Sequence, residues 1–472
     1  MKICMILEGS YPYVQGGVSS WMHQYIQAMP DTEFVLWCIA AEAKDRGKFK
    51  YQLPENVVGV KEVFLDDALR LLWRKKNSRQ IQLSAEEKTE ISKFFCGENF
   101  QWDVLFDIFQ NKKINPVELL MSPTFLQLLI QICREKYPYI SFAEYFHTMR
   151  SMLLPELYLL TTEIPKADLY HATATGYSGL LGSMGKWKNK KPFILTEHGI
   201  YTREREEELL GASWVLPYFK DQWIQLFYAF SQCAYSHADR VTALFSNASK
   251  TQAEIGCDTD KLTVIENGVH FERFSEITAK KENGFIDIGA VVRIAKIKDI
   301  KTMIYAFAEV KNAVSNARLF ILGGVDDEEY FEECKSLISQ LAIKDISFTG
   351  AVNVLEYMPG FDFTILTSIS EGQPLSVLES FAAGRPCVTT DVGCCRELIM
   401  GKEEDTLGIA GLCVPPMHRE LLASSIIQMC REKQNRLHMG EVGRERVRMY
   451  YTHENSMEKY RELYREVLSW QE

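Results

Sequence analysis

Short apolar stretches alternate with longer segments of helical periodicity along most of the chain. The first, MKICMILEG (residues 1–9), is almost entirely apolar, as expected for a parallel strand buried on both faces. A loop with Tyr, Pro and Gly follows, and then VSSWMHQYIQAM, whose apolar residues recur at helical spacing. The pattern returns in EFVLWCIAA, ADLYHA, PFILTEHG, ADRVTALF and KLTVIENG. This alternation predicts a doubly wound, Rossmann-like α/β domain.

Between about residue 65 and residue 165 the sequence becomes rich in aromatic residues, and its apolar residues recur at helical spacing. Examples are LLWRKKN, KFFCGENFQWDVLFDIF and FLQLLIQICREKYPYISFAEYF. We expect a helical insertion in the first domain. A small helical core covering the sheet is favoured over a membrane or partner surface, which stays open as the alternative.

A second series of strands and helices begins near residue 285. Its strands are FIDIGAVVRI, ARLFILGG, ISFTGAV, DFTILTS, RPCVTTDVG and AGLCVPP. We place the boundary near residue 278, which gives an N-terminal domain over 1–278 and a C-terminal domain over 279–450. The amphipathic stretch over 451–472 is expected to form a helix that crosses back to the first domain. Two such domains are expected to face a cleft at the carboxyl ends of both sheets.

Composition and charge narrow the class of protein. The chain has 472 residues, more than one core of ordinary size needs. A net charge of −10 argues against non-specific nucleic-acid binding, which requires a basic surface. Twelve cysteines without a CxxC pair, and a start without a signal-peptide pattern, predict a reduced, cytoplasmic protein. No stretch of 18 apolar residues occurs, and peripheral attachment to a membrane through partners stays open.

The segment EGQPLSVLES (residues 371–380) places two carboxylates around a predicted helix start. Pro374 suits the first helical position, so the free N–H groups from Leu375 onward form an anion site, and Gly372 lets a phosphate approach. On one helix, Glu371 and Glu379 would lie about 12 Å apart, farther than acid/base pairs of glycoside hydrolysis. They therefore suit two parts of one long ligand, a nucleotide sugar with its diphosphate at the helix start. Two solvated glutamates remain the alternative.

Two cations, Arg293 and Lys298, lie in VVRIAKIKDIKT after the first strand of the second domain. Such a pair can neutralise a diphosphate leaving group, Arg through its planar fork and Lys as a point charge. The alternative is a solvated helix start, but cations there oppose the helix dipole.

His198, in TEHGIY, ends a predicted strand of the first domain, where catalytic groups of such sheets lie, and a structural histidine is an equal alternative. His171 in ADLYHA has the same location with weaker support. Gly16 and Gly17 precede the first helix and can approach a phosphate or a sugar. Neither they nor TGYSGLLGSMG matches GxGxxG, which counts against a nicotinamide or flavin dehydrogenase.

We expect no catalytic metal. The DxD pair Asp258 and Asp260 lies in a turn before a strand and is interpreted as a turn and helix cap. No His/Glu cluster has zinc-ligand spacing. The basic segment GKWKNKK (residues 185–191) is expected to be a solvated loop, with an anionic surface as the alternative.

Taken together, these motifs resemble the GT-B glycosyltransferases of family 4 over most of the chain. They are Glu371 to Glu379, Arg293 with Lys298, ENGVHFERF (266–274), FTGAV (348–352), EHG (197–199) and the GG loop. The opening segment and the helical insertion resemble, more narrowly, the cytosolic transferases of Pel exopolysaccharide systems. The cation loop departs from the family pattern, which commonly has Gly before the Arg and after the Lys. This chain has Ala290 and Val291 upstream and Asp299 downstream.

The resemblance implies a retaining, metal-independent hexosyltransferase. The donor would be UDP-glucose or a UDP-N-acetylhexosamine, and the acceptor a growing exopolysaccharide or glycan. Membrane-bound polysaccharide synthase or export subunits are implied as partners. The implied contacts are Glu379 with the ribose, Glu371 with the donor sugar, Arg293, Lys298 and the Pro374–Leu375 helix start with the diphosphate, His198 with the sugar near its anomeric carbon, Gly16 and Gly17 with phosphate or acceptor, and the Val352 backbone with the base.

Two other functions stay open from the sequence. A nucleotide-sugar epimerase of the same architecture would convert the donor without any acceptor. A non-catalytic UDP-sugar-binding subunit of a polysaccharide synthase would bind the donor and never cleave it.

Overall fold

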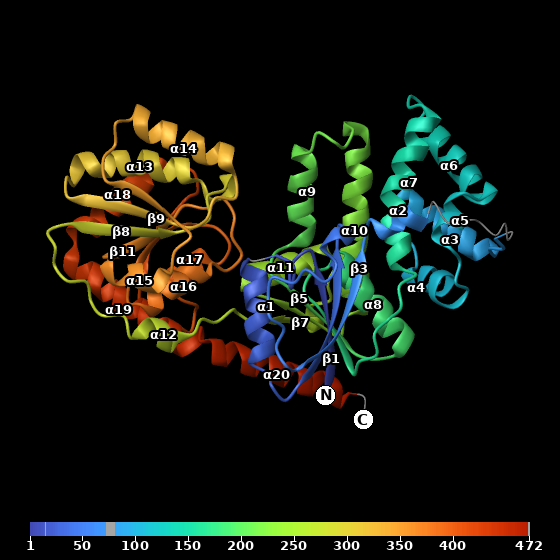
Figure 1. The fold of residues 1–472 in the computed structure, drawn as a ribbon, viewed down its shortest axis with the longest axis horizontal. Coiled ribbons are helices and arrows are strands. Elements are labelled where there is room, and N and C mark those ends of the chain that lie inside the picture. Colours follow the sequence, from blue (N-terminus) through green and yellow to red (C-terminus); the bar gives the residue numbers. More distant parts are fainter. Residues whose placement is uncertain (15, 72–80, 471–472) are drawn as a thin grey trace. The chain divides into compact units, whose positions relative to one another are not determined.

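The computed structural model describes residues 1–14, 16–71 and 81–470, and the chain divides into two compact units (Figure 1). Unit 1 comprises Met1–Ala243, Ser249–Thr263 and the chain from Tyr464. Unit 2 comprises Leu244–Ala248 and Val264–Leu463. Each unit has a parallel sheet flanked by helices, so the predicted class of two Rossmann-like domains is confirmed.

The sheet of unit 1 has the strand order β3-β2-β1-β4-β5-β6-β7. The buried pattern of β1 agrees with the uninterrupted apolar run in the sequence. We did not predict β3, in which Lys61 and Glu62 interrupt the apolar run at the edge of the sheet. The strands are β1 (Lys2–Glu8), β2 (Glu33–Ala40), β3 (Val57–Phe64), β4 (Leu169–Ala172), β5 (Phe193–Glu197), β6 (Arg240–Ala243) and β7 (Leu262–Val264).

Helices cover this sheet and project from it. Helix α8 packs against β1, β4 and β5, and α10 packs against α8 and α9. The segment GKWKNKK is not the loop we expected, because residues 185–189 form the last turn of α8, where cations complement the helix dipole. The helices are α1 (Gly17–Gln27), α8 (Tyr177–Asn189), α9 (Tyr201–Gly211), α10 (Lys220–His237) and α11 (Ser246–Ile255).

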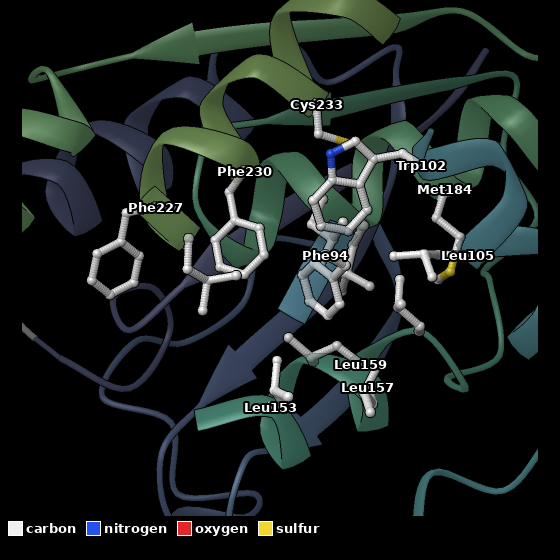
Figure 2. Packing of buried hydrophobic residues seen from close by; sticks show 14 of the residues in the cluster. Phe94, Trp102, Leu105, Leu153, Leu157, Leu159, Met184, Phe227, Phe230 and Cys233 are labelled. Carbon is white, nitrogen blue, oxygen red and sulfur yellow. The ribbon is translucent and has the colours of Figure 1, made fainter. Parts of the chain in front are cut away.

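The predicted insertion is helical in the part of it that the structure describes, and residues 72–80 lie outside the described residues. Ser84, Ser122 and Ser141 cap three of its helices with their side chains. Its buried side chains join those of the sheet in one hydrophobic core (Figure 2). Its elements are α2 (Asp67–Leu71), α3 (Ala85–Cys96), α4 (Trp102–Phe106), a π-helical turn (Asp107–Asn111), α5 (Pro116–Leu120), α6 (Pro123–Lys136) and α7 (Phe142–Leu159).

The sheet of unit 2 has the strand order β10-β9-β8-β11-β12-β13. Helices α13, α14 and α18 lie on one side of it and α16 and α19 on the other (Figure 1). The strands are β8 (Ile286–Val291), β9 (Ala317–Leu322), β10 (Ile346–Gly350), β11 (Phe363–Leu366), β12 (Cys387–Thr390) and β13 (Gly411–Val414). The helices are α12 (Phe271–Ser275), α13 (Ile300–Ala313), α14 (Glu328–Gln340), α15 (Val354–Tyr357), α16 (Leu375–Ala382), α17 (Cys395–Met400), α18 (Arg419–Arg431) and α19 (Lys433–Tyr450).

The division of the chain lies earlier than residue 278. Residues 264–278 belong to unit 2, because Val269, Phe271 and Phe274 pack into its hydrophobic core. The last helix, α20 (His453–Ser469), begins in unit 2, and its residues from Tyr464 group with unit 1. Tyr464 is fully buried there, and its hydroxyl contacts His171 Nδ1 at 2.6 Å.

Candidate active site

The two loops that carry the predicted charged residues meet at one edge of the unit 2 sheet. The strand order reverses beside β8, since β9 follows on one side and β11 lies on the other. Ligands of open α/β sheets bind at the carboxyl ends of the strands at such a point. Arg293 and Lys298 follow β8, and Glu371 follows β11.

Backbone hydrogen bonds fix the cation loop, which carries Arg293 and Lys298, to the end of β9 and the residues after it. The backbone N–H groups of Val292 and Ile294 donate to Leu322 O and Gly324 O, each at 2.8 Å. Arg293, between them, points outward with its side chain 63% exposed and forms an ion pair with Asp326. Lys298 ends a 3₁₀ turn (Lys296–Lys298).

Asp299 explains how this chain departs from the family pattern after the lysine. Its φ is 48° and its ψ is 51°, the left-handed conformation that favours glycine. The Asp299 side chain accepts a hydrogen bond from Thr302 N–H at 3.3 Å and so caps α13. Asp tolerates this conformation better than most residues and offers a cap that glycine lacks. The turn therefore forms without the glycine.

Lys298 and Glu371 are in direct contact. Lys298 Nζ donates to Glu371 Oε1 at 2.6 Å, and the two side chains are only 17% and 12% exposed. The Ser368 hydroxyl donates to the same carboxylate oxygen. From the sequence, Lys298 was expected to bind the diphosphate and Glu371 the sugar, and the structure brings the two side chains together. Arg293 forms its ion pair with Asp326 instead.

A neighbouring loop fixes the backbone around Glu371. Gly393 has a φ of 55°, and a Cβ atom there would lie 2.2 Å from Glu371 O and 2.3 Å from Gly372 O. Cys394 N–H donates to Gly372 O at 3.0 Å. Both Cys394 and Cys395 are buried, as expected for structural residues. Glycine at residue 393 thus permits the close packing that holds the acidic loop.

The helix after this loop begins one residue later than predicted. Pro374 is the N-cap of α16, and Leu375 is the first helical residue. A proline cap provides no side-chain acceptor, and no side chain caps the start of α16 among the described residues. Its first N–H groups and the positive end of the dipole therefore stay available to an anion.

Glu379 lies one turn into α16, about 6 Å along the axis from Leu375. Burial raises the pKa of its half-buried carboxyl to about 7, and nearby Arg273 opposes the rise. Because Glu371 precedes the helix, the helical spacing of 12 Å does not apply to the two glutamates. Val352 lies between β10 and α15 and packs against the unit 2 core.

His198 follows β5 in unit 1. Its ring meets the Trp21 ring edge-on, with the centroids 4.4 Å apart. Burial lowers the pKa of His198 to about 4, so the imidazole is neutral at physiological pH. The buried Nε2 atom has no hydrogen-bond partner among the described residues. A buried polar atom without a protein partner is uncommon and is usually bonded to a water or to a ligand group.

Gly16 and Gly17 lie at the start of α1. Gly16 is the N-cap and Gly17 the first helical residue, and no side chain caps this helix among the described residues. Apart from its neighbours in the chain, a Cβ atom at either position would meet no atom of a described residue within 4 Å. The fold itself therefore does not require glycine here, which agrees with a close approach by a ligand.

The start of α8, in the glycine-rich TGYSGLLGSMG segment, is already occupied by Glu8. The Glu8 carboxylate accepts hydrogen bonds from Ser178 N–H at 3.2 Å and from the Tyr201 hydroxyl at 3.3 Å. A Cβ atom at Gly176 would lie 2.3 Å from the Tyr201 ring. An internal carboxylate thus takes the place where a dinucleotide phosphate would bind. Sequence analysis did not single out Glu8, although it ends the first strand.

Two weaker candidates have structural roles. His171 is fully buried, and its ring nitrogens contact the Tyr464 hydroxyl and, at 2.8 Å, the Thr196 hydroxyl. Burial lowers the pKa of His171 to about 3. The Asp258 carboxylate accepts a hydrogen bond from Asp260 N–H and caps a 3₁₀ turn, as predicted.

Sequence analysis missed Ser368, which holds Glu371, and Asp326, which pairs with Arg293. Ser368 follows β11 closely, and a polar residue at a strand end is a signal that could have identified it. None of the described helices is long and apolar enough to cross a membrane. Within the described ranges, no group of three or more His, Cys, Asp or Glu residues could hold a metal ion.

Two parallel sheets of this order, with the charged loops at the carboxyl ends of β8 and β11, define a protein of the GT-B architecture. Residues 1–260 match the family model described as Domain of unknown function (DUF3492), and residues 271–446 match Glycosyl transferases group 1. The chain therefore belongs to the DUF3492 family and carries a glycosyl transferases group 1 domain.

Two curated relatives are similar to parts of the chain. N-acetyl-alpha-D-glucosaminyl L-malate synthase of Bacillus anthracis is 29% identical, over 49% of this chain and 60% of that protein. Alpha-monoglucosyldiacylglycerol synthase of Streptococcus pneumoniae is 28% identical, over 36% of this chain and 44% of that protein. The chain thus spans about half the length of these two relatives.

Solved structures share the fold along the whole chain. Anabaena Alr3699/HepE in complex with UDP and glucose has a TM-score of 0.61 and 14% identity, over 99% of this chain and 100% of that one. Sucrose-phosphate synthase from Thermosynechococcus elongatus has a TM-score of 0.61 and 15% identity, with the same coverage.

Proposed function

We propose that the protein is a retaining, metal-independent glycosyltransferase that moves a hexosyl unit from a UDP-sugar to a saccharide acceptor. The contact of Lys298 with Glu371, beside the uncapped start of α16, carries this proposal. It puts a cation and a set of free N–H groups beside a carboxylate that can bind sugar hydroxyls. The glycosyl transferases group 1 domain and the UDP-bound structure of HepE support it.

In this function the residues of unit 2 lower the barrier at the leaving group. The bond between the anomeric carbon and the β-phosphate oxygen breaks, and negative charge develops on that oxygen. Lys298 and the N–H groups at the start of α16 stabilise this charge because they are already in position, and Arg293 joins them when the donor binds. Arg293 must exchange its contact with Asp326 for the diphosphate, and its exposed side chain is free to do so.

The anomeric configuration of the sugar is retained because the transfer takes place on one face of the ring. The acceptor hydroxyl attacks the anomeric carbon on the side that the phosphate leaves, and the departing phosphate oxygen takes the hydroxyl proton. Glu371 binds donor-sugar hydroxyls, Glu379 the ribose diol, and the Val352 backbone the base. We assign to His198 a contact with the donor sugar near its anomeric carbon, and to Gly16 and Gly17 a close approach to phosphate or acceptor.

We further propose UDP-glucose or a UDP-N-acetylhexosamine as the donor and a growing exopolysaccharide as the acceptor. The resemblance of the opening segment and the insertion to PelF, the transferase of Pel exopolysaccharide systems, supports that choice. It also implies a cytoplasmic enzyme that works with membrane-bound synthase or export subunits.

Release of UDP from a panel of UDP-sugars, with and without a chelator, tests the proposal. We expect release from one sugar to survive chelation and to fall about 100-fold or more in Lys298→Ala and Glu371→Ala. Lys296→Ala is the matched control, since Lys296 lies in the same turn with its side chain 66% exposed. Glu403→Ala, an exposed carboxylate, controls for Glu371→Ala.

Other outcomes identify the alternatives. Conversion of the donor to a stereoisomer without UDP release would establish the epimerase. Binding of the donor with no UDP release in the presence of saccharide acceptors would favour a non-catalytic subunit.

A further inference from the structure

Unit 1 contains a cavity of about 740 Å³ that involves none of the residues assigned above. We call it the α10 cavity. Its walls are the loop between α3 and α4, the first residues of α4, and one face of α10. The side chains that matter for its chemistry are Phe100, Trp102, Gln225, Tyr228, Gln232 and His237.

The α10 wall is an exposed helix face without ionised side chains. Gln225, Tyr228 and Gln232 follow one another at spacings of three and four residues, so they form one row along the helix. Residues 222–236 of α10 contain no Asp, Glu, Lys or Arg. Exposed helix faces usually carry such charges. An uncharged row of amide, phenol and amide is therefore a feature that solvation alone does not explain.

The opposite wall is held firmly in place. Gly97 ends α3 in the left-handed conformation with a φ of 69°, and a Cβ atom there would lie 2.2 Å from Gln225 Oε1. Gln225 thus packs across the end of α3. Gln101 N–H donates to Glu90 Oε2 at 2.7 Å, which anchors the other end of the loop. Both ends of this loop are therefore held by contacts with α3 and α10, while Glu98, Asn99 and Gln101 are exposed.

Aromatic rings provide the apolar part of the cavity. The Phe100 and Trp102 rings lie 4.7 Å apart, and Trp102 is only 8% exposed. Figure 2 shows the Trp102 indole between Cys233 and Phe94, and all three side chains belong to the hydrophobic core of unit 1. Tyr228 is half-buried on the α10 side.

The charge of the lining disfavours an anionic ligand. The described residues that line the cavity include no Lys or Arg. The Asp103 carboxylate contacts His237 Nε2 at 3.0 Å, and the Glu98 carboxylate contacts Lys136 at 3.4 Å. A phosphate or nucleotide would meet these two carboxylates here, and no Lys or Arg of the described lining would replace its hydration.

A neutral polyol fits the remaining chemistry. Side-chain amides both donate and accept hydrogen bonds, as hydroxyl groups require, and aromatic rings pack against the apolar C–H face of a pyranose. The volume lies within the range of roughly 300–1,000 Å³ that small-ligand sites occupy. A peptide suits the cavity less well, because the lining offers few aliphatic side chains, chiefly Ile224 and Ala229, and no free strand edge.

We propose that the α10 cavity binds a neutral saccharide segment, with a pyranose packed on the aromatic side chains and its hydroxyls bonded to Gln225 and Gln232. The identity of that segment as part of the acceptor chain rests on the function proposed above. In that role the cavity holds acceptor residues away from the bond that forms, and the enzyme prefers longer acceptors.

Calorimetric titration of the full-length protein with chitotetraose, cellotetraose and maltotetraose tests this site. We expect at least one tetrasaccharide to bind saturably, and Gln232→Ala and Tyr228→Ala each to weaken it about tenfold or more, while UDP affinity stays unchanged. Tyr139→Ala, whose ring is 99% exposed, is the matched control for the loss of an aromatic side chain. Gln340→Ala, an exposed amide in unit 2, controls for Gln232→Ala.

Two results would contradict the proposed saccharide site. If none of the three tetrasaccharides binds to the wild type, or if binding is undiminished in both folded variants, the α10 cavity is not a saccharide site. Gln232 is exposed, so Gln232→Ala should fold even if Tyr228→Ala does not. Circular dichroism of each variant establishes that.

Kinetics separate this proposal from the transferase function. We expect Gln232→Ala to raise the KM for a tetrasaccharide acceptor and to leave kcat and the slow UDP-sugar hydrolysis unchanged. If no UDP is released from any donor but tetrasaccharide binding is present and lost in the variants, the saccharide site stands and the transferase function fails. If transfer occurs and Gln232→Ala leaves the KM unchanged, the role in acceptor binding is wrong.

Discussion

Lys298 Nζ lies 2.6 Å from Glu371 Oε1, and both side chains are largely shielded from solvent. The carboxylate keeps the ammonium group extended toward the loop that leads into α16. It also neutralises a charge that the proposed function needs for the diphosphate. Glu371 therefore positions Lys298 and competes with the phosphate for it.

This competition predicts opposite effects on UDP and on UDP-sugar in Glu371→Gln. We expect UDP to bind about threefold to tenfold more tightly, since an ion pair of this kind contributes about 1 kcal/mol. Turnover of UDP-sugar should fall about 100-fold, because the amide no longer binds the sugar hydroxyls as the carboxylate does. Calorimetry with UDP and a UDP-release assay measure the two effects.

The matched variants are Lys298→Met, which should weaken UDP binding, and Glu403→Gln, which should change neither quantity. Weaker UDP binding in Glu371→Gln would contradict the competition and would leave Glu371 with a positioning role only.

Glu379 predicts a pH dependence of donor binding. Its pKa is raised to about 7 by burial, and the ionised carboxylate is the form that accepts hydrogen bonds from a ribose diol. Lowering the pH from about 8 to about 6 protonates it, so we expect the affinity for UDP-glucose to fall about tenfold. UDP-glucose is the suitable ligand because its diphosphate is a diester that does not titrate in this range.

Glu379→Gln should bind UDP-glucose more weakly at the higher pH and show little change on acidification. Calorimetric titration at a series of pH values measures both. A variant that retains the full pH dependence would assign it to another group.

His198 combines a pKa lowered to about 4 with a buried Nε2 atom that has no partner among the described residues. It should therefore act as a neutral hydrogen-bonding group and not as an acid or base near neutral pH. We expect His198→Ala to lower kcat about 100-fold and to leave the pH profile between pH 6 and 8 unchanged in shape. His147→Ala, an exposed histidine on α7, is the control.

Steady-state kinetics across that pH range measure this effect. The contrary result is an inflection of the wild-type pH profile, near the ordinary pKa of histidine, that is lost in His198→Ala. In that case the imidazole titrates during turnover, and the neutral role of His198 is wrong.

The local pattern of apolar and polar residues predicted most of the strands and the loops that follow them. The apolar runs that became β1, β8 and β11 are short and bounded by glycine, charged or small polar residues, so their ends could be located. The rule that ligands bind at the carboxyl ends of strands then made Lys298 a candidate, and the two glutamates around a predicted helix start made Glu371 another. Their contact was not predicted, since it depends on β8 and β11 being neighbours in the sheet.

Other parts of the site depend on contacts between distant segments. Asp326 pairs with Arg293 because β8 and β9 are adjacent, and Gly393 supports Glu371 from the loop after β12. The left-handed conformation of Asp299 could not be predicted, because this position lacks the glycine that the family commonly has. The Asp299 side chain instead supports the turn by capping α13. The α10 cavity likewise joins the end of α3 to a helix more than a hundred residues later.

Glu156, on α7 of the insertion, predicts a pH-dependent stability. It is 1% exposed, and burial raises its pKa from 4.5 to about 8. The Tyr177 hydroxyl donates to Glu156 Oε1 at 3.1 Å, and Oε2 has no partner among the described residues. The folded protein therefore holds this proton at pH values at which the unfolded chain has released it.

The contribution of Glu156 to stability must then fall as the pH rises from about 4.5 to about 8, because over that window its carboxyl holds a proton in the folded state that it has released in the unfolded state. Glu156→Gln removes the titration and keeps an acceptor for Tyr177. We expect its free energy of unfolding, relative to wild type, to rise across this window by about 1 kcal/mol or more and then to level off. Urea unfolding at intervals from about pH 5 to about pH 9 measures the difference. Glu135→Gln, on the exposed surface of α6, controls for the loss of a carboxylate. A relative stability of Glu156→Gln that stays constant with pH would show that Glu156 is ionised in the folded protein and that the insertion provides it with a partner or with water.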